Sequence, residues 1–183
     1  LQNKLVQGYD APTGGTNTNP CGTNDGNHGT HVSGTVGAES NNGIGVASIG
    51  YNVSIMPIKI GNCTGALTHG YEGINYAANN GADVVNMSWG GGGFSTYGQN
   101  VCNAAFNAGT ILVAAAGNDG TNQQFYPAAY NNVIAVSSTT TNDAKSSFSQ
   151  YGTWITISAP GSAIRSTYAT SNSGYARIQG TSM

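Results

Sequence analysis

Residues 110–120 read Thr-Ile-Leu-Val-Ala-Ala-Ala-Gly-Asn-Asp-Gly, an apolar run that ends in a polar turn. An apolar run without polar alternation is typical of a strand that is buried on both faces. Similar runs occupy 53–60 and 83–89, and shorter candidates lie at 133–136 and 155–157. Strands buried on both faces predict a parallel sheet, with a ligand crevice outside the carboxyl ends of the strands.

Helical patterns fill the stretches between these strands. Apolar residues recur at helical spacing between 67 and 78, and Gly81 supplies a stop. Ser95 can cap a second helix, which Gly109 closes. This alternation predicts an α/β fold over residues 1–183, with three layers: a mainly parallel central sheet and helices on both faces.

Composition excludes two classes of partner. The net charge is −2 and charged residues make up only 7%, so no basic field is present to bind nucleic acid. No apolar run approaches the roughly 18 residues that a membrane span requires. The stretch 8–27 is rich in Gly, Asn, Thr and Pro, and we interpret it as a long surface loop.

Three polar motifs carry candidate chemistry. His28 and His31 lie three residues apart in Asn-His-Gly-Thr-His. The zinc-protease motif has its two histidines four residues apart with a general-base Glu between them, so this segment does not match it. Ser182 is the third residue of the run Gly-Thr-Ser-Met at 180–183, and a serine becomes a nucleophile only when a base takes its proton. Asn118 stands at the carboxyl end of an apolar strand, where its amide could donate to an oxyanion.

In this order, these motifs resemble those of the subtilisin-type serine proteases, the subtilases. The resemblance extends over residues 24–183, through the runs Asn-Asn-Gly-Ile-Gly-Val-Ala at 41–47, Val-Asn-Met-Ser-Trp-Gly-Gly at 85–91 and Tyr-Pro-Ala at 126–128. It implies a serine endopeptidase that hydrolyses peptide bonds, without a cofactor for catalysis.

The resemblance also implies a role for each catalytic residue. His28 would be the general base, and His31 would pack beneath the site. Ser182 would be the nucleophile, and its backbone N–H would join the side chain of Asn118 in the oxyanion hole.

The chain departs from the family pattern at both ends. The expected Asp of a Val-Ile-Asp-Thr-Gly run is absent, and Asp10 and Asp25, the only carboxylates before His28, lie in other contexts. The sequence also stops one residue after Ser182. We therefore expect a partial catalytic domain that lacks the catalytic-Asp strand and everything after the nucleophile motif. With Ser182 on a frayed terminus, it should be inactive alone. The alternative is a catalytically silent subtilase-like domain retained for binding.

Substrate contacts follow from the same resemblance. Two segments, Cys63-Thr64-Gly65 and Ser88-Trp89-Gly90, match the strands that flank an extended peptide substrate. Ala115, Ala116 and Gly117 match the walls of the primary specificity pocket. Phe125 matches the pocket floor, where its ring would shorten the pocket, unless the ring turns toward the core.

A structural calcium ion is a further implication. The loop 40–46 matches a calcium site of the family, with Ser40, Asn42, Ile44 and Val46 as the candidate ligands. Calcium takes six to eight oxygen ligands. The alternative is that Asn41-Asn42-Gly43 is only a turn.

The remaining expectations concern the disulfide bridge, the cellular location and the partners. Three cysteines allow one bridge and one spare thiol. By resemblance the bridge joins Cys21 to Cys63, with Cys63–Cys102 as the alternative. We expect a secreted, monomeric protein whose partners are an extended protein or peptide substrate and, in the precursor, a propeptide.

Overall fold

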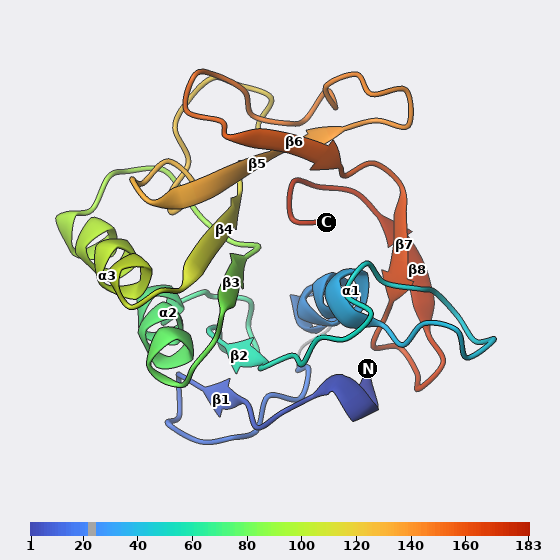
Figure 1. The fold of residues 1–183 in the computed structure, drawn as a ribbon. Helices are drawn as coiled ribbons and strands as arrows, with labels where there is room; N and C mark the ends of the chain where they lie inside the picture. The colour runs from blue at the N-terminus through green and yellow to red at the C-terminus, as the bar shows by residue number, and fades with distance from the viewer. Residues whose placement is uncertain (22–24) are drawn as a thin grey trace. The chain divides into compact units, whose positions relative to one another are not determined.

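The structure, a computed structural model, describes residues 1–21 and 25–183 (Figure 1). Its contacts divide into two compact units, each described here by itself. The first comprises Leu1–Tyr76 with Arg165–Arg177, and the second Ala77–Ile164 with Ile178–Met183. In chain order the elements are η1 (Gln2–Lys4), β1 (Tyr9–Asp10), α1 (Asp25–Gly37), β2 (Ile58–Lys59), α2 (Gly70–Asn79), β3 (Val84–Met87), α3 (Thr96–Asn107), β4 (Ile111–Ala115), β5 (Val133–Thr139), β6 (Ile157–Pro160), β7 (Ile164–Thr167) and β8 (Tyr175–Ile178).

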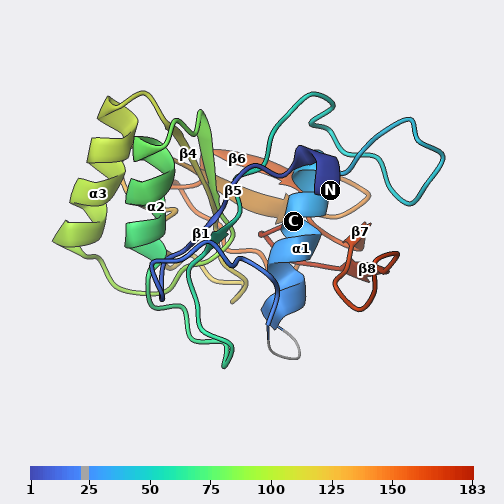
Figure 2. The ribbon, with the colours of Figure 1, turned by 90° about the horizontal axis from the view of Figure 1, so that it is seen from below.

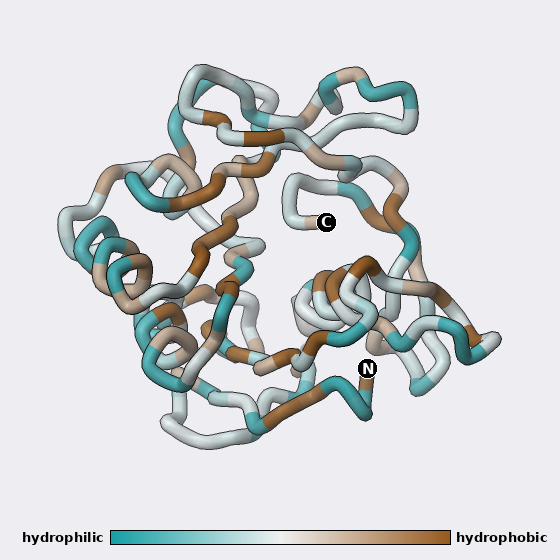
Figure 3. The backbone as a smooth tube through the Cα atoms, viewed as in Figure 1, coloured by the Kyte–Doolittle hydropathy of each residue, from teal (hydrophilic) through white to brown (hydrophobic). Residues whose placement is uncertain are grey.

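A four-stranded parallel sheet in the order β3-β4-β5-β6 forms the centre of the second unit. Its register pairs Val84 with Ile111 and Leu112 with Val133. The hydrophobic stretches in Figure 3 follow these strands, as the apolar runs predicted. Strand β6 begins at Ile157, two residues later than expected. Ile155 belongs to the preceding turn, where its N–H donates to the carbonyl of Gly152.

Helix α3 packs against this sheet (Figure 2). Ser95 caps it as predicted, because the Ser95 side chain accepts a hydrogen bond from the N–H of Gly98. The helix buries Val101, Cys102 and Ala105. Opposite them, alternate residues of β4, Leu112 and Ala114, are 1% exposed each, so this interface is the apolar core of the unit.

Cys102 gives a prediction about pH. Its side chain is fully buried, and burial raises the pKa of its thiol to about 11. The neutral thiol is therefore favoured in the folded state, and its stabilising contribution is present below about pH 9 and lost as pH rises toward 11. We expect a thiol reagent at pH 8 to modify Cys102 only after denaturation. The urea midpoint should fall from pH 9 to 11 more steeply in the native protein than in Cys102→Ala. Rapid modification of the folded protein would contradict this.

The first unit departs from two expectations. The run 53–60 contributes only the two-residue strand β2, which lies outside the four-stranded sheet. The stretch 8–27 is not wholly a surface loop, because β1 pairs in parallel with β2 and aligns Tyr9 with Ile58. Asp10 is only 3% exposed and forms an ion pair with Lys59 at 3.2 Å. A two-residue strand is too short to show a hydrophobic period, so the sequence contains no local signal for β1.

Helix α1 is held in the first unit by close packing. A Cβ on Gly34 would lie 2.1 Å from Oγ1 of Thr167, so only glycine allows this approach. The same Oγ1 donates to the carbonyl of Thr30 at 2.8 Å. Within the described ranges, none of the helices has the length and hydrophobicity that a bilayer crossing requires.

A disulfide joins Cys21 to Cys63 in the first unit, with a Cα separation of 5.0 Å. Cys102 is a buried free thiol. The pairing implied by the family resemblance is the one in the structure, and the alternative Cys63–Cys102 bridge is wrong.

Candidate active site

Polar residues gather at the carboxyl edge of the sheet in the second unit. Ser88 follows β3 directly, and Gly117-Asn118 comes just after β4. The end of the chain reaches the same edge, because the N–H of Gly180 donates to the carbonyl of Gly161, which follows β6. This edge is where open α/β sheets bind their ligands.

Thr181 fastens the C-terminal segment to the end of β4. Its Oγ1 accepts the N–H of Gly117 at 3.0 Å. Its own N–H and hydroxyl both donate to Oδ1 of Asn118, at 2.9 and 3.1 Å. Thr181 is 7% exposed; its bond to Gly117 is buried and its two bonds to Asn118 are partly buried, and together they fix the position of the following residue.

The same hydrogen bonds set the orientation of the Asn118 amide. Because two donors of Thr181 meet Oδ1, the Nδ2 group must point the other way, with its N–H groups available. The position that a Cβ on Gly180 would occupy is 3.6 Å from this Nδ2 and 3.7 Å from the backbone nitrogen of Ser182. Among the described residues, neither nitrogen donates to another protein group. Both nitrogens therefore lie within 4 Å of one point beside Ser182, which Sδ of Met183 also approaches, at 3.4 Å.

Ser182 itself is half-buried and held in place. The hydroxyl of Ser88 donates to the Ser182 carbonyl at 2.8 Å, and the Ser182 hydroxyl lies 3.4 Å from the Ser88 carbonyl. The expectation of a frayed terminus is therefore wrong. Hydrogen bonds anchor Thr181 to Asn118 and Ser182 to Ser88, which lie 63 and 94 positions earlier in the chain.

The two histidines of α1 lie in the first unit and differ in exposure. His31 is fully buried, whereas His28, almost one turn earlier, is half-buried. A general base must reach its substrate, so the difference agrees with the assignment of His28 as the base and His31 as a packing residue. Because Ser182 and Asn118 belong to the second unit, the convergence of His28 with Ser182 stays a prediction.

The expected pocket residues of the second unit lie beside Ser88. Ala115 and Ala116 are 6% and 0% exposed, and Gly117 is buried. The ring of Phe125 is half-exposed and contacts Gly90, where a Cβ would lie 2.4 Å from its Cε1. Phe125 thus faces the segment after β3.

Cys63-Thr64-Gly65, the other expected substrate segment, lies in the first unit. It forms a turn around Asn62, whose Oδ1 accepts the N–H groups of Thr64 and Ala66 at 3.0 and 3.1 Å. The disulfide to Cys21 anchors the same turn. Its role in binding substrate stays a prediction.

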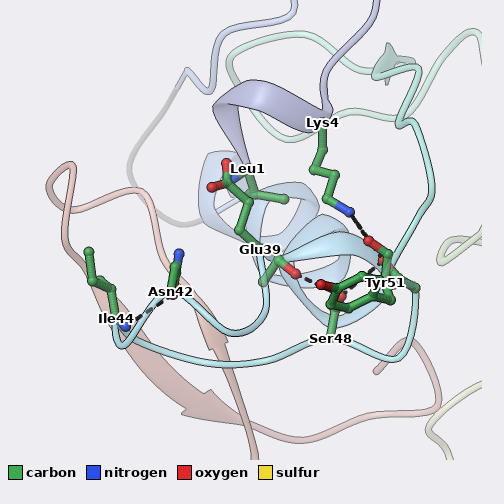
Figure 4. A network of polar contacts seen from close by, with 9 residues as sticks. Leu1, Lys4, Glu39, Asn42, Ile44, Ser48 and Tyr51 are labelled. Atoms are coloured by element: carbon green, nitrogen blue, oxygen red, sulfur yellow. Dashed lines mark hydrogen bonds and ion pairs between the residues drawn. The ribbon is translucent and has the colours of Figure 1, made fainter.

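Residues 39–47, which include the candidate calcium ligands Ser40, Asn42, Ile44 and Val46, line a surface pocket. Left-handed φ angles at Asn41, Gly43 and Gly45 alternate with the candidate ligands. In Figure 4 the Asn42 side chain turns back onto this loop, where its Oδ1 accepts the N–H of Ile44 at 3.0 Å.

Contacts within the first unit brace this loop. The Lys4 ammonium donates to the carbonyl of Tyr51 (Figure 4). The Ser48 hydroxyl donates to the carbonyl of Ala38 at 2.8 Å. The oxygen ligands that this loop can offer are of the kind that calcium binds. They are backbone carbonyl oxygens and the Asn42 amide oxygen, and Glu39 is the one carboxylate that lines the pocket. Across residues 1–21 and 25–183, no three His, Cys, Asp or Glu side chains gather as metal ligands do.

Sequence reasoning missed two contributions to the site. Ser88 was expected only as a substrate contact, yet its hydroxyl binds the Ser182 carbonyl. Thr181 was part of a motif without an assigned role, yet it orients Asn118. Separations of 94 and 63 residues leave no local signal for either contact.

Known proteins match this chain in sequence and in fold. The subtilase family profile matches residues 3–183. The chain is 42% identical over 185 residues to thermitase of Thermoactinomyces vulgaris, covering all of this chain and 64% of thermitase. It is 45% identical over 177 residues to an extracellular protease of Xanthomonas campestris, covering 85% of this chain and 30% of that protein. A solved protease structure from Pseudoalteromonas arctica superposes with a TM-score of 0.87 at 34% identity, covering 100% of this chain and 69% of that one.

The family profile and the match to thermitase span the positions of every motif described above. The structural likeness extends to the full α/β architecture and confirms the predicted fold class. The chain thus spans 64% of the length of thermitase and 30% of the length of the extracellular protease. The chain belongs to the subtilase family.

Proposed function

We propose that the protein containing this chain is a secreted serine endopeptidase, with Ser182 as nucleophile, His28 as general base and Asn118 as oxyanion donor. The observation that carries the proposal is the placement of two nitrogens, Nδ2 of Asn118 and the backbone nitrogen of Ser182, within 4 Å of one point beside Ser182. Such preoriented donors stabilise the charge that develops during acyl transfer. The name of the Xanthomonas campestris relative, an extracellular protease, supports secretion.

The proposed reaction has two stages. His28 takes the proton of the Ser182 hydroxyl as its oxygen attacks the peptide carbonyl, and the carbonyl oxygen becomes negatively charged between the N–H groups of Asn118 and Ser182. When the C–N bond breaks, His28 gives that proton to the leaving amine. Water then attacks the acyl-enzyme with His28 again as base, and this step releases the acid and regenerates Ser182.

His28 also requires a partner that orients its ring. Asp10 is bound to Lys59, and Asp25, the other carboxylate before His28, lies in a context unlike the Val-Ile-Asp-Thr-Gly run of the family. We infer that the orienting carboxylate comes from sequence outside residues 1–183, and that these residues alone turn over substrate about 10⁴-fold more slowly than the whole protein.

The substrate is an extended protein or peptide segment. It would pair with the backbones of Ser88-Trp89-Gly90 and Cys63-Thr64-Gly65, a recognition mode in which main-chain hydrogen bonds give affinity. Its side chain before the scissile bond would lie among Ala115, Ala116 and Gly117.

Phe125 gives a prediction about specificity. Because its ring contacts Gly90, a residue of the proposed substrate-binding segment, we infer that it takes up space in the proposed pocket, so that small side chains before the scissile bond should be preferred. We expect Phe125→Gly to raise kcat/KM for a phenylalanine substrate relative to an alanine substrate about 10- to 100-fold, since a few buried methylenes have about this effect. Parallel assays of the two peptides measure the ratio. An unchanged ratio would mean that the ring lies outside the pocket.

Calcium and a propeptide belong to the same proposal. The loop 39–47 would hold a calcium ion through carbonyl oxygens and Asn42, and the ion would brace the loop without entering the reaction. Few charged ligands imply weak binding. A propeptide would accompany the precursor, and we expect a monomer.

The experiment that tests the proposed function uses the protein expressed from its complete gene. A fluorophosphonate probe should label it at Ser182, and an unfolded protein substrate should be cleaved into mapped peptides. Residues 1–183 expressed alone should label far more slowly. A complete protein that neither labels nor cleaves would support the silent binding domain instead.

A further inference from the structure

Gln150 is a buried amide side chain next to the loop that carries Asn118. It is 2% exposed. Its Oε1 accepts the N–H of Asp119 at 3.2 Å, and its Nε2 donates to the carbonyl of Gln123 at 3.1 Å. Its backbone N–H donates to the carbonyl of Gly117 at 3.1 Å. Gln150 therefore binds the chain on both sides of Asn118.

The fit between Gln150 and this loop is close. A Cβ on Gly117 would lie 2.2 Å from Oε1 of Gln150, and Gly117 has a φ of +105°. Glycine is required there for both reasons. The two partners also fix the orientation of the Gln150 amide, since Oε1 faces an N–H and Nε2 faces a carbonyl.

One continuous network links Gln150 to the nucleophile. Gln150 holds Gly117 and Asp119, the Gly117 N–H binds Thr181, and Thr181 binds Oδ1 of Asn118. Ser182 follows Thr181 directly. Gln150, Gly117 and Thr181 are all buried, and hydrogen bonds in such a network support one another.

We propose that Gln150 is a positioning residue that sets the place and direction of the Asn118 amide for the developing oxyanion. The proposal rests on the proposed function. A catalytic group must be held within about 0.5 Å of its productive geometry, and a loop gains that precision only from buried supporting contacts. Because the oxyanion exists only in the transition state, displacing its donor lowers kcat and leaves KM nearly unchanged.

The test is Gln150→Met in the complete protein, which keeps the side-chain volume and removes both amide hydrogen bonds. We expect kcat to fall about 10-fold or more, with KM changed less than about twofold. Gln99→Met is the matched control. Gln99 also accepts a backbone N–H and donates to a backbone carbonyl, both of Asn131, and it donates to Oδ1 of Asn103; neither partner belongs to the Asn118 loop. It should keep kcat within about twofold.

A double-mutant cycle separates positioning from general stability. With Asn118→Ala already present, Gln150→Met should lower kcat less than about twofold, because the group that Gln150 positions is gone. An equal fall in both backgrounds would overturn the proposal, and so would a rise in KM with kcat unchanged. If Gln150→Met does not fold, Gln150→Asn replaces it, since its amide is one methylene too short to reach both partners.

Hydrogen exchange tests the positioning role of Gln150 independently of protease activity. The amide N–H of Asp119 should exchange about 10-fold faster in Gln150→Met than in the native protein, and remain unchanged in Gln99→Met. If the native protein cleaves nothing but this exchange accelerates, the proposed function fails while Gln150 still positions the loop. Unchanged exchange at Asp119 would overturn the positioning role itself.

Discussion

Ser182→Ala in the complete protein is expected to lower turnover about 10⁶-fold, the size of effect that loss of the nucleophile has in subtilisin. In the proposed reaction the hydroxyl oxygen of Ser182 forms the covalent bond with the substrate, so its removal should not be compensated by a neighbouring group. A chromogenic peptide assay with enzyme quantified by mass measures the loss. Fluorophosphonate labelling should disappear as well.

The control for this variant is Ser54→Ala, which removes an exposed hydroxyl of the first unit. It should keep both labelling and turnover. A small residual rate in Ser182→Ala is expected, because the remaining oxyanion and binding groups still accelerate attack by water about 10³- to 10⁴-fold. Full labelling of Ser182→Ala would place the nucleophile elsewhere.

Asn118→Ala is expected to lower kcat about 10²- to 10³-fold, the effect of removing the corresponding donor from subtilisin, and to leave KM nearly unchanged. The substitution has a second consequence. Oδ1 of Asn118 accepts two hydrogen bonds from Thr181, so alanine also leaves the N–H and the hydroxyl of Thr181 without this acceptor. Kinetic analysis alone would mix the two effects.

Asn118→Asp separates them. The carboxylate keeps an acceptor for Thr181, so the melting temperature should stay closer to the native value than that of Asn118→Ala. It removes the Nδ2 donor and places negative charge beside the oxyanion, so turnover should fall at least as far as in Asn118→Ala. An active Asn118→Asp enzyme would contradict the role of Asn118 as oxyanion donor.

Local patterns predicted the main elements of the second unit. The apolar run before Gly117 became β4, and Ser95 caps α3 with a hydrogen bond that spans three residues. These signals are local, because a cap or a periodicity lies within one or two turns of chain. The short strand β1 left no such signal, and its buried Asp10 was mistaken for part of a surface loop.

The sequence by itself determined the family motifs, and with them the identities of His28, Asn118 and Ser182 as candidate catalytic residues. Only the tertiary structure decided how the second unit holds two of these residues. Thr181 turns the Asn118 amide, and Ser88 binds Ser182. Gln150 holds the loop on both sides of Asn118. These contacts join residues 31 to 94 positions apart. Their geometry depends on the parallel strands that bring distant segments to one edge of the sheet, which no local pattern encodes.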